Sequence, residues 1–396
     1  MKYWRGYLVA AIFGAMAWIL SKLAEKFTVL VDMFYPYVTR TVLTFLSSWS
    51  GGVDFLVWQL VLVLALLLVL TTVVLMIVLR WNFVQWLGWV LSCVMLVYLM
   101  HTGIYGLNYY AGPISDDVRM TVDEGEYTLE EIQDTVVYYQ ELANKLANEM
   151  PRDEDGHLIY SSFSELAQQA GEGFETLTYV NCYSVFAGST DPVKELGWAD
   201  LFSSMGITGI TIGLTGEAAV NPQIPVVALP FTMCHEMAHR MSIATESDAN
   251  FAAFLACRAN SSPEFQYSAY FMAYIYALNT LNNVNSPEAS TAASRIATGT
   301  NYNLSRDLKA YNKFFDDKYN ESATNLADYA NDTYLKVSGD EGISSYGGVG
   351  DLLVRLYIQE VVLPAEEEDA KSTFDPFDED QVDLEGIVGA LPKENP

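Results

Sequence analysis

The chain has 396 residues, of which 51% are hydrophobic, and it carries a formal net charge of −28 at pH 7. Its first 104 residues hold six Lys or Arg and three Asp or Glu, so the acidic excess lies in the rest of the chain. Nucleic-acid phosphates and anionic lipid surfaces repel so acidic a unit, which excludes a nucleic-acid-binding function. The length allows one membrane region and a water-soluble domain with a full core.

Three N-terminal segments are predicted to cross a bilayer as helices. Residues 7–23 form a short apolar run after two basic residues, a pattern that also fits a signal peptide, but no convincing small-residue cleavage site follows it. Residues 56–79 are rich in Leu and Val and uncharged. Residues 81–105 carry Trp near one end and Tyr toward the other, as interfacial anchors do. We therefore predict that residues 1–105 form a membrane region whose partner is the lipid bilayer.

The basic residues around these segments predict an orientation. Lys2, Arg5 and Arg80 fall on one side if the three spans alternate, and the positive-inside rule makes that side cytoplasmic. The first loop, with Lys22, Lys26 and Arg40, argues the other way. Three spans would place residues 106–396 on the extracytoplasmic side.

The remaining chain reads as a mostly helical domain over residues 106–363 with a small sheet. A capping box at residues 128–131 opens a helix to about residue 150, and a short helix is predicted over 163–170. Residues 206–216 alternate as a strand or hairpin edge, whose glycines permit close backbone approach or merely weaken an ordinary hairpin. Later helices are predicted over residues 265–281, 303–335 and 351–363. The acidic residues 364–396 are predicted to be a disordered tail.

One motif carries candidate chemistry: residues 234–240 read Cys-His-Glu-Met-Ala-His-Arg. His235 and His239 are two of only four histidines, and at i and i+4 on a helix both imidazoles can bind one metal ion. Glu236 can then polarise a metal-bound water, as in His-Glu-x-x-His zinc peptidases. The simpler alternative is a buried helix with two satisfied histidines.

A catalytic zinc takes three protein ligands, and the sequence after the motif offers carboxylates. Thr245 and Asp248 form a variant capping box that opens a second helix, and Asp248 is the predicted third ligand. Glu246 is the alternative ligand, and Glu264 is a more distant candidate. Any of these acids could instead only favour the positive end of a helix dipole.

Five stretches resemble the bacterial membrane family known as domain of unknown function 3810: residues 34–37, 215–221, 229–239, 246–257 and 334–347. The resemblance implies a membrane-anchored, zincin-like protein without an established substrate. Members tend to carry Glu where this chain has Asp248. Tyr346, in a loop matching the family pattern, becomes the candidate for oxyanion stabilisation, and Glu217 and Asn221 become candidates for orienting the histidines.

Together these patterns predict a membrane-anchored α+β protein, with three transmembrane helices followed by a zincin-like domain outside the bacterial cytoplasmic membrane. The predicted activity is hydrolysis of a peptide bond in a peptide or protein substrate, with Zn²⁺ as cofactor, His235, His239 and Asp248 as ligands and Glu236 as general base. A catalytically silent binding or scaffold protein with a structural zinc is the alternative. An intramembrane protease is disfavoured because residues 229–245 are too polar and too far from the apolar runs.

Overall fold

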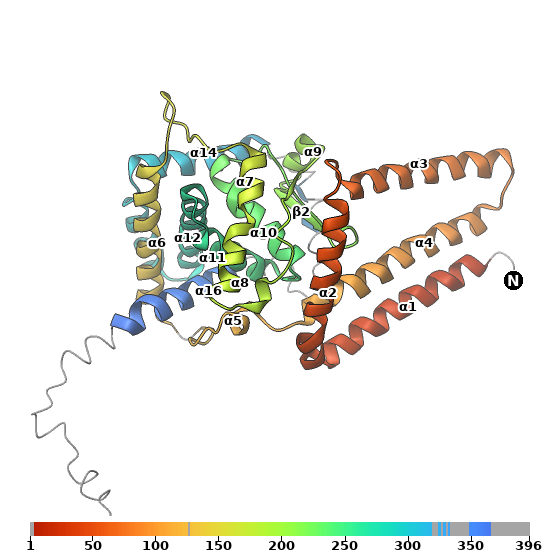
Figure 1. The fold of residues 1–396 in the computed structure, drawn as a ribbon, viewed down its shortest axis with the longest axis horizontal. Coiled ribbons are helices and arrows are strands. Elements are labelled where there is room, and N and C mark those ends of the chain that lie inside the picture. Colours follow the sequence, from red (N-terminus) through yellow and green to blue (C-terminus); the bar gives the residue numbers. More distant parts are fainter. Residues whose placement is uncertain are drawn as a thin grey trace, which may run out of the picture.

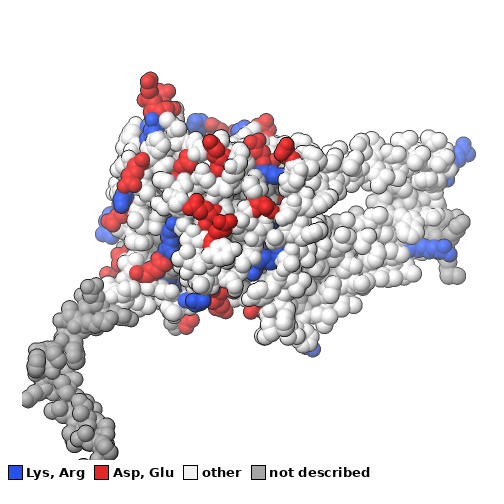
Figure 2. All heavy atoms as spheres, viewed as in Figure 1, with Lys and Arg blue, Asp and Glu red and all other residues white. Residues whose placement is uncertain are grey.

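The computed structural model describes residues 4–125, 127–318, 324–325, 328–329, 332 and 348–365. Its described elements are mostly helices, with one small sheet. Apolar helices extend from one side of a compact helical unit that holds the remaining elements (Figure 1). Acidic side chains are scattered over the compact unit, whereas the extended helices are almost free of charge along their length (Figure 2).

Three helices are long and apolar enough to cross a membrane: α1 (Arg5–Lys26), α3 (Val57–Val78) and α4 (Phe83–Ile104). They confirm the three apolar helices predicted from the sequence. Helices α1 and α4 lie side by side, and a Cβ on Gly6 would come within 2.5 Å of the backbone of Gly88. Such small residues let two apolar helices approach closely. The chain therefore carries a membrane anchor at its N-terminal end.

Helix α2 (Thr28–Ser50) occupies the segment expected to be a loop, and it crosses the region between the apolar helices and the compact unit (Figure 1). Pro36 lies inside it, which is why the sequence pattern gave no helix there. The Thr39 hydroxyl lies within hydrogen-bond distance of the carbonyl oxygens of Tyr35 and Pro36, at 3.1 and 3.3 Å, and donates to them. One face of α2 is buried against the compact unit and the other is exposed and apolar.

The compact unit is built around helices whose starts follow the sequence signals. Helix α6 (Leu129–Glu149) begins with the predicted capping box, and α7 (Phe163–Gln169) begins with a second one. Helix α8 (Gly171–Tyr179) follows directly. The other long helices are α11 (Glu246–Ala259), α12 (Pro263–Asn283), α13 (Pro287–Ala297), α14 (Tyr302–Lys318) and α16 (Gly348–Tyr357). The predicted tail over residues 364–396 lies almost wholly outside the described residues.

The sheet has three short strands in the order β1-β3-β2, with β1 (Lys194–Glu195) parallel to the central β3 (Glu217–Val220). Strand β2 (Gly209–Ile212) pairs antiparallel with β3, so residues 206–216 contain an edge strand, in agreement with the predicted strand or hairpin edge. Strand β3 is fully buried, and β2 is a half-buried edge strand. Helix α10 (Leu229–Arg240) packs against both strands and against α11 and α12, so it lies at the centre of the core.

Candidate metal centre

Helix α10 carries His235, Glu236 and His239 at the spacing the sequence predicts. Pro230 lies in its first turn, where a proline costs no hydrogen bond, and the residues that follow are compatible with a helix. All but one of its twelve residues are buried, and Arg240 at its end donates to the carbonyls of Ser189 and Asp191. The helix is therefore held rigidly, and the two histidines point to the same side.

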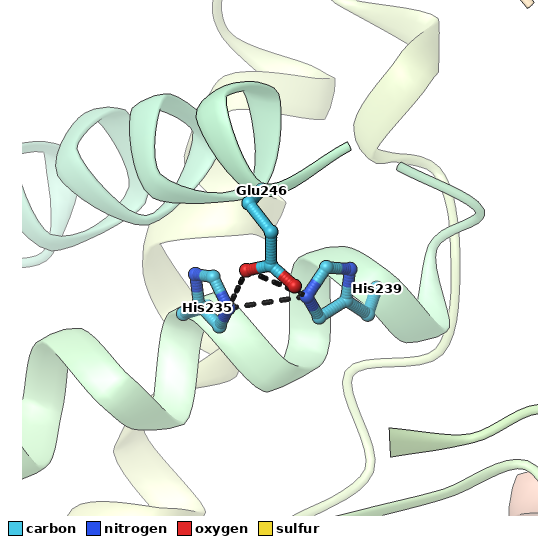
Figure 3. Close-up of side chains that lie close together, drawn as sticks. All are labelled: His235, His239 and Glu246. Atoms are coloured by element: carbon cyan, nitrogen blue, oxygen red, sulfur yellow. Dashed lines mark hydrogen bonds and ion pairs between the residues drawn. The ribbon is translucent and has the colours of Figure 1, made fainter. Parts of the chain in front are cut away.

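The side chains of His235, His239 and Glu246 converge on one point (Figure 3). The Nε2 atoms of the two histidines are 3.1 Å apart. The Oε2 atom of Glu246 is 3.3 Å from Nε2 of His235 and 3.8 Å from Nε2 of His239. Within the described part of the chain, these three side chains form a group of donor atoms that could hold a metal ion.

The carboxylate in this group is Glu246, the alternative ligand of the sequence analysis, and Asp248 is outside it. Consecutive residues of a helix are rotated by about 100°, so residues 246 and 248 point in widely different directions. Glu246 and Asn250, one turn apart, both line the cavity described below. Asp248 lies in the first turn of α11, where its backbone N–H donates to Thr245 Oγ1 at 3.4 Å. Glu246 therefore lies on the face of α11 that turns toward α10, and Asp248 does not.

Hydrogen bonding fixes the ring of His239. Its Nδ1 lies 2.9 Å from the carbonyl oxygen of Ile243, so Nδ1–H donates and Nε2 is the nitrogen left to bind a metal once its proton is lost. This Nε2 lies 3.1 Å from Nε2 of His235. Two zinc-bound imidazole nitrogens, each about 2.05 Å from a tetrahedral ion, are separated by about 3.3 Å. The N, N, O donor set and its spacing therefore fit a zinc ion.

The charges of the group are coupled through Glu246. Burial alone would lower the pKa of His239, but the hydrogen bond and the negative charge of Glu246 outweigh it and raise that pKa to about 9. Burial would raise the pKa of Glu246, yet its contacts with the two histidines hold the pKa well below the usual range. Without a metal, the positive charge of protonated His239 offsets the negative charge of the buried Glu246 carboxylate.

Glu236 lies beside the group and is held by strand β2. The hydroxyl of Thr211 is 2.7 Å from Glu236 Oε2 and 2.8 Å from the Glu236 backbone oxygen. A Cβ on Gly209 would come within 2.4 Å of Glu236 Oε1, so any larger residue there would displace the carboxylate or the strand. Burial raises the pKa of Glu236, while the two histidines and Thr211 partly offset that rise. A buried carboxylate with a raised pKa is suited to exchanging a proton near neutral pH.

A cavity of about 760 Å³ opens at these side chains. His235, Glu236, His239 and Glu246 form one part of its wall, and most of the remainder is apolar. The wall also includes residues of β2, α10, α11, α12 and α14, and of the end of α4. His235, Glu236 and His239 thus face this cavity from helix α10.

Other residues proposed from the sequence lie elsewhere. Glu217 accepts hydrogen bonds from the backbone N–H groups of Val57 and Trp58 and from Lys194 Nζ, which fixes the start of α3. Asn221 donates to the carbonyl of Ala199 and to Ser203 Oγ. These hydrogen bonds of Glu217 and Asn221 hold the sheet and its neighbouring helices, and none of them reaches the histidines.

Tyr346, the candidate for oxyanion stabilisation, lies outside the described residues. Glu264 lies at the start of α12, where it accepts from the Ser161 N–H at 2.6 Å, and it is absent from the His235–His239–Glu246 group.

Two site residues were not found from the sequence. The Tyr105 hydroxyl lies 3.5 Å from His239 Nδ1, although the sequence suggested only an interfacial aromatic. Thr211 was one of several threonines in an alternating stretch. No local signal distinguished it, because its role depends on how β2 lies against α10.

The comparisons place the chain in a family. A family model described as "Protein of unknown function (DUF3810)" matches residues 31–354. The chain belongs to this family. No curated protein and no solved structure matches the chain. The family membership agrees with the resemblance noted in the sequence and carries no activity with it.

Proposed function

We propose that this DUF3810 protein is a membrane-anchored zinc metallopeptidase. The observation that carries the proposal is the convergence of two histidine Nε2 atoms and the Glu246 carboxylate beside a buried Glu236 at the wall of a large cavity. Structural zinc sites are usually closed by four protein ligands, whereas catalytic sites keep three and an open position. The described residues supply three donors and an adjoining space, which favours the catalytic reading.

The residues would divide the work as follows. His235, His239 and Glu246 would hold one zinc ion, which as a Lewis acid lowers the pKa of water to about 7 and polarises a carbonyl. Glu236 would accept the proton of the attacking water and pass it to the leaving amine. Thr211 and Gly209 would hold the Glu236 carboxylate in place, and the edge strand β2 would offer backbone groups to an extended substrate.

The anchor is proposed to be multi-pass, with the compact unit outside the cytoplasmic membrane. Arg5 and Arg80 belong to the ends of α1 and α3 far from the compact unit, where Figure 2 shows basic side chains. Of the opposing charges, Lys22 forms an ion pair with Glu25, and Arg40 is buried against the compact unit. The positive-inside rule then favours the Arg80 end as cytoplasmic.

Metal content and activity test the proposal together. The full chain in detergent should bind about one zinc ion, and His235→Ala or His239→Ala should abolish that binding. Glu236→Gln should keep zinc and lower peptidase activity by roughly 10²- to 10⁴-fold, because it removes only the general base. Full zinc content in both histidine variants would refute the metal site. If Glu236→Gln retains full activity, the silent binding protein with a structural zinc becomes the better account.

A further inference from the structure

We infer that the enzyme cuts membrane-anchored polypeptides in the segment that leaves the bilayer, and that this segment reaches the metal centre from the membrane side. The inference rests on the proposed peptidase function and on the membrane anchor, and it specifies the substrate class. Three features carry it: the depth of the metal centre, the wall of the cavity, and the apolar face of α2.

Tyr105 fixes the depth of the metal centre. It is the first residue after α4, and its hydroxyl lies 3.5 Å from His239 Nδ1. Helix α4 has 22 residues and a length of about 33 Å, close to the roughly 30 Å hydrocarbon thickness of a bilayer. The end of α4 therefore marks the hydrocarbon boundary. The histidines lie about one tyrosine side chain from that boundary, at the level of the lipid headgroups.

The cavity extends along α4 below this level. Val97 and His101, about two turns and one turn before the end of the helix, line it together with Tyr105. At about 1.5 Å per residue, Val97 lies roughly 10 Å farther into the bilayer than the end of α4. Ile210 and Ile212 of strand β2 also line the cavity. A chain leaving the bilayer beside α4 thus meets an apolar wall first and the metal centre next.

Helix α2 holds this arrangement against the bilayer. Arg40 Nε donates to the Met241 carbonyl at 3.1 Å, and Thr39 Oγ1 lies 2.9 Å from Ser242 Oγ, immediately after the metal-binding helix α10. The opposite face of α2 is apolar and exposed, with Phe34, Val38 and Phe45 each at least 59% exposed. A helix with such a face beside membrane-spanning helices lies in the lipid interface. Lipid contact on α2 would fix α10 and its metal centre near the membrane surface. A water-soluble protein substrate would have little access to the metal centre there.

The test uses two probes that share one membrane but differ in distance from it. The first is a segment of randomised sequence attached directly to a transmembrane helix of about 20 apolar residues. The second carries the same segment after a proline-rich spacer of about 15 residues, which extends roughly 45 Å from the anchor. Each is co-reconstituted with the full zinc-loaded chain in phosphatidylcholine vesicles, and cuts are mapped by mass spectrometry. Because both probes are anchored in the same membrane as the chain, co-localisation cannot explain a difference between their cutting rates.

We expect the direct probe to be cut within about ten residues of its anchor and the spaced probe at least about tenfold more slowly. Equal rates, or cuts far from the anchor, would overturn the inference while leaving the peptidase function intact. If neither probe is cut faster by the wild-type chain than by Glu236→Gln, the proposed function fails and the inference fails with it.

A matched pair of variants tests the membrane-side wall. Val97→Trp narrows the cavity at α4 and should slow cutting of the direct probe at least about tenfold. Val94→Trp, on the same helix at an exposed position outside the cavity wall, should leave the rate unchanged. Equal effects of the two substitutions would contradict entry along α4. Zinc content of both variants serves as the measure of an intact fold.

Discussion

The hydroxyl of Thr211 lies 2.7 Å from Oε2 of Glu236, so the edge strand β2 directly holds the proposed general base. This contact joins residues 25 positions apart, from a strand and from the helix that carries the histidines. A hydrogen bond to a carboxylate stabilises its charged form and therefore lowers its pKa. The position of β2 thus affects both the geometry and the proton affinity of Glu236.

Thr211→Val should move the pH profile of the enzyme. Valine keeps the shape and the strand preference but removes the donor to Glu236, so the pKa of Glu236, already raised by burial, should rise further. The acid limb of kcat against pH should shift to higher pH, because Glu236 with a higher pKa loses its proton, and becomes an active base, only at a higher pH. Thr215→Val removes a hydroxyl that donates only weakly to the Ile212 carbonyl, and it should leave the profile in place. An unshifted profile in Thr211→Val would argue that Glu236 is not the base.

Gly209→Ala should damage catalysis without removing the metal. The added Cβ would lie 2.4 Å from Glu236 Oε1, so the carboxylate or the strand must move. We expect kcat to fall by about 10²-fold or more, within the range for loss of a general base, while zinc content stays near that of the wild type. Gly103→Ala is the matched control, because a Cβ there meets nothing within 4 Å. Full activity of Gly209→Ala would show that Glu236 tolerates displacement.

The third ligand can be assigned by two carboxylate substitutions. Glu246→Ala should lower zinc affinity by more than the roughly 10- to 100-fold that loss of an outer contact costs. Asp248→Ala should retain zinc, because Asp248 lies outside the His235–His239–Glu246 group. Competition against a fluorescent zinc chelator measures both affinities. The reverse result would restore Asp248 as the ligand and require α11 to rotate from its present position.

The sequence predicted those parts of the site that local spacing determines. Two histidines at i and i+4 share a helix face in any α-helix. Apolar runs long enough to cross a bilayer predict membrane-spanning helices, as at α1, α3 and α4. Capping residues likewise predicted the starts of α6 and α11. These features need no knowledge of packing.

The remaining features depend on tertiary packing. Glu246 and Asp248 are equally plausible first-turn acids, and the rotation of α11 is set by buried aromatics such as Phe251 and Phe254. Helix α2 contains Pro36 and buries the charged Arg40, so neither hydropathy nor propensity indicated a helix there. The approach of Tyr105 to His239 joins residues 134 positions apart, which no local pattern encodes.

The metal-free protein should lose stability at alkaline pH. The pKa of His239 is raised from 6.5 to about 9, so its pairing with Glu246 stabilises the fold fully below about pH 6.5 and is lost as the pH rises through about 9. The effect is of the order of a few kcal/mol, because each pKa unit corresponds to about 1.4 kcal/mol. Thermal unfolding of the chelator-treated chain between about pH 6 and 10 measures it.

Two comparisons check the origin of that alkaline loss. Glu246→Ala removes the partner that raises the pKa of His239, so its unfolding temperature should depend much less on pH over the same range. Zinc should replace the proton on His239, so binding should release protons and strengthen with pH up to about 9. Zinc affinity that is independent of pH between about 7 and 9 would contradict the pairing.

Helix α2 should lie in the lipid interface of the reconstituted protein. A nitroxide at Phe45→Cys, on a side chain that is 70% exposed in the absence of lipid, should be accessible to oxygen and shielded from a water-soluble nickel chelate. Tyr302→Cys on α14, 77% exposed, should show the opposite accessibilities. The background needs Cys93→Ala and Cys182→Asn, because these two cysteines are exposed and Cys182 has a φ of 60°, which asparagine tolerates. Equal water accessibility at both labels would show that α2 faces solvent, and the metal centre would then lie above the bilayer surface instead of at the headgroups.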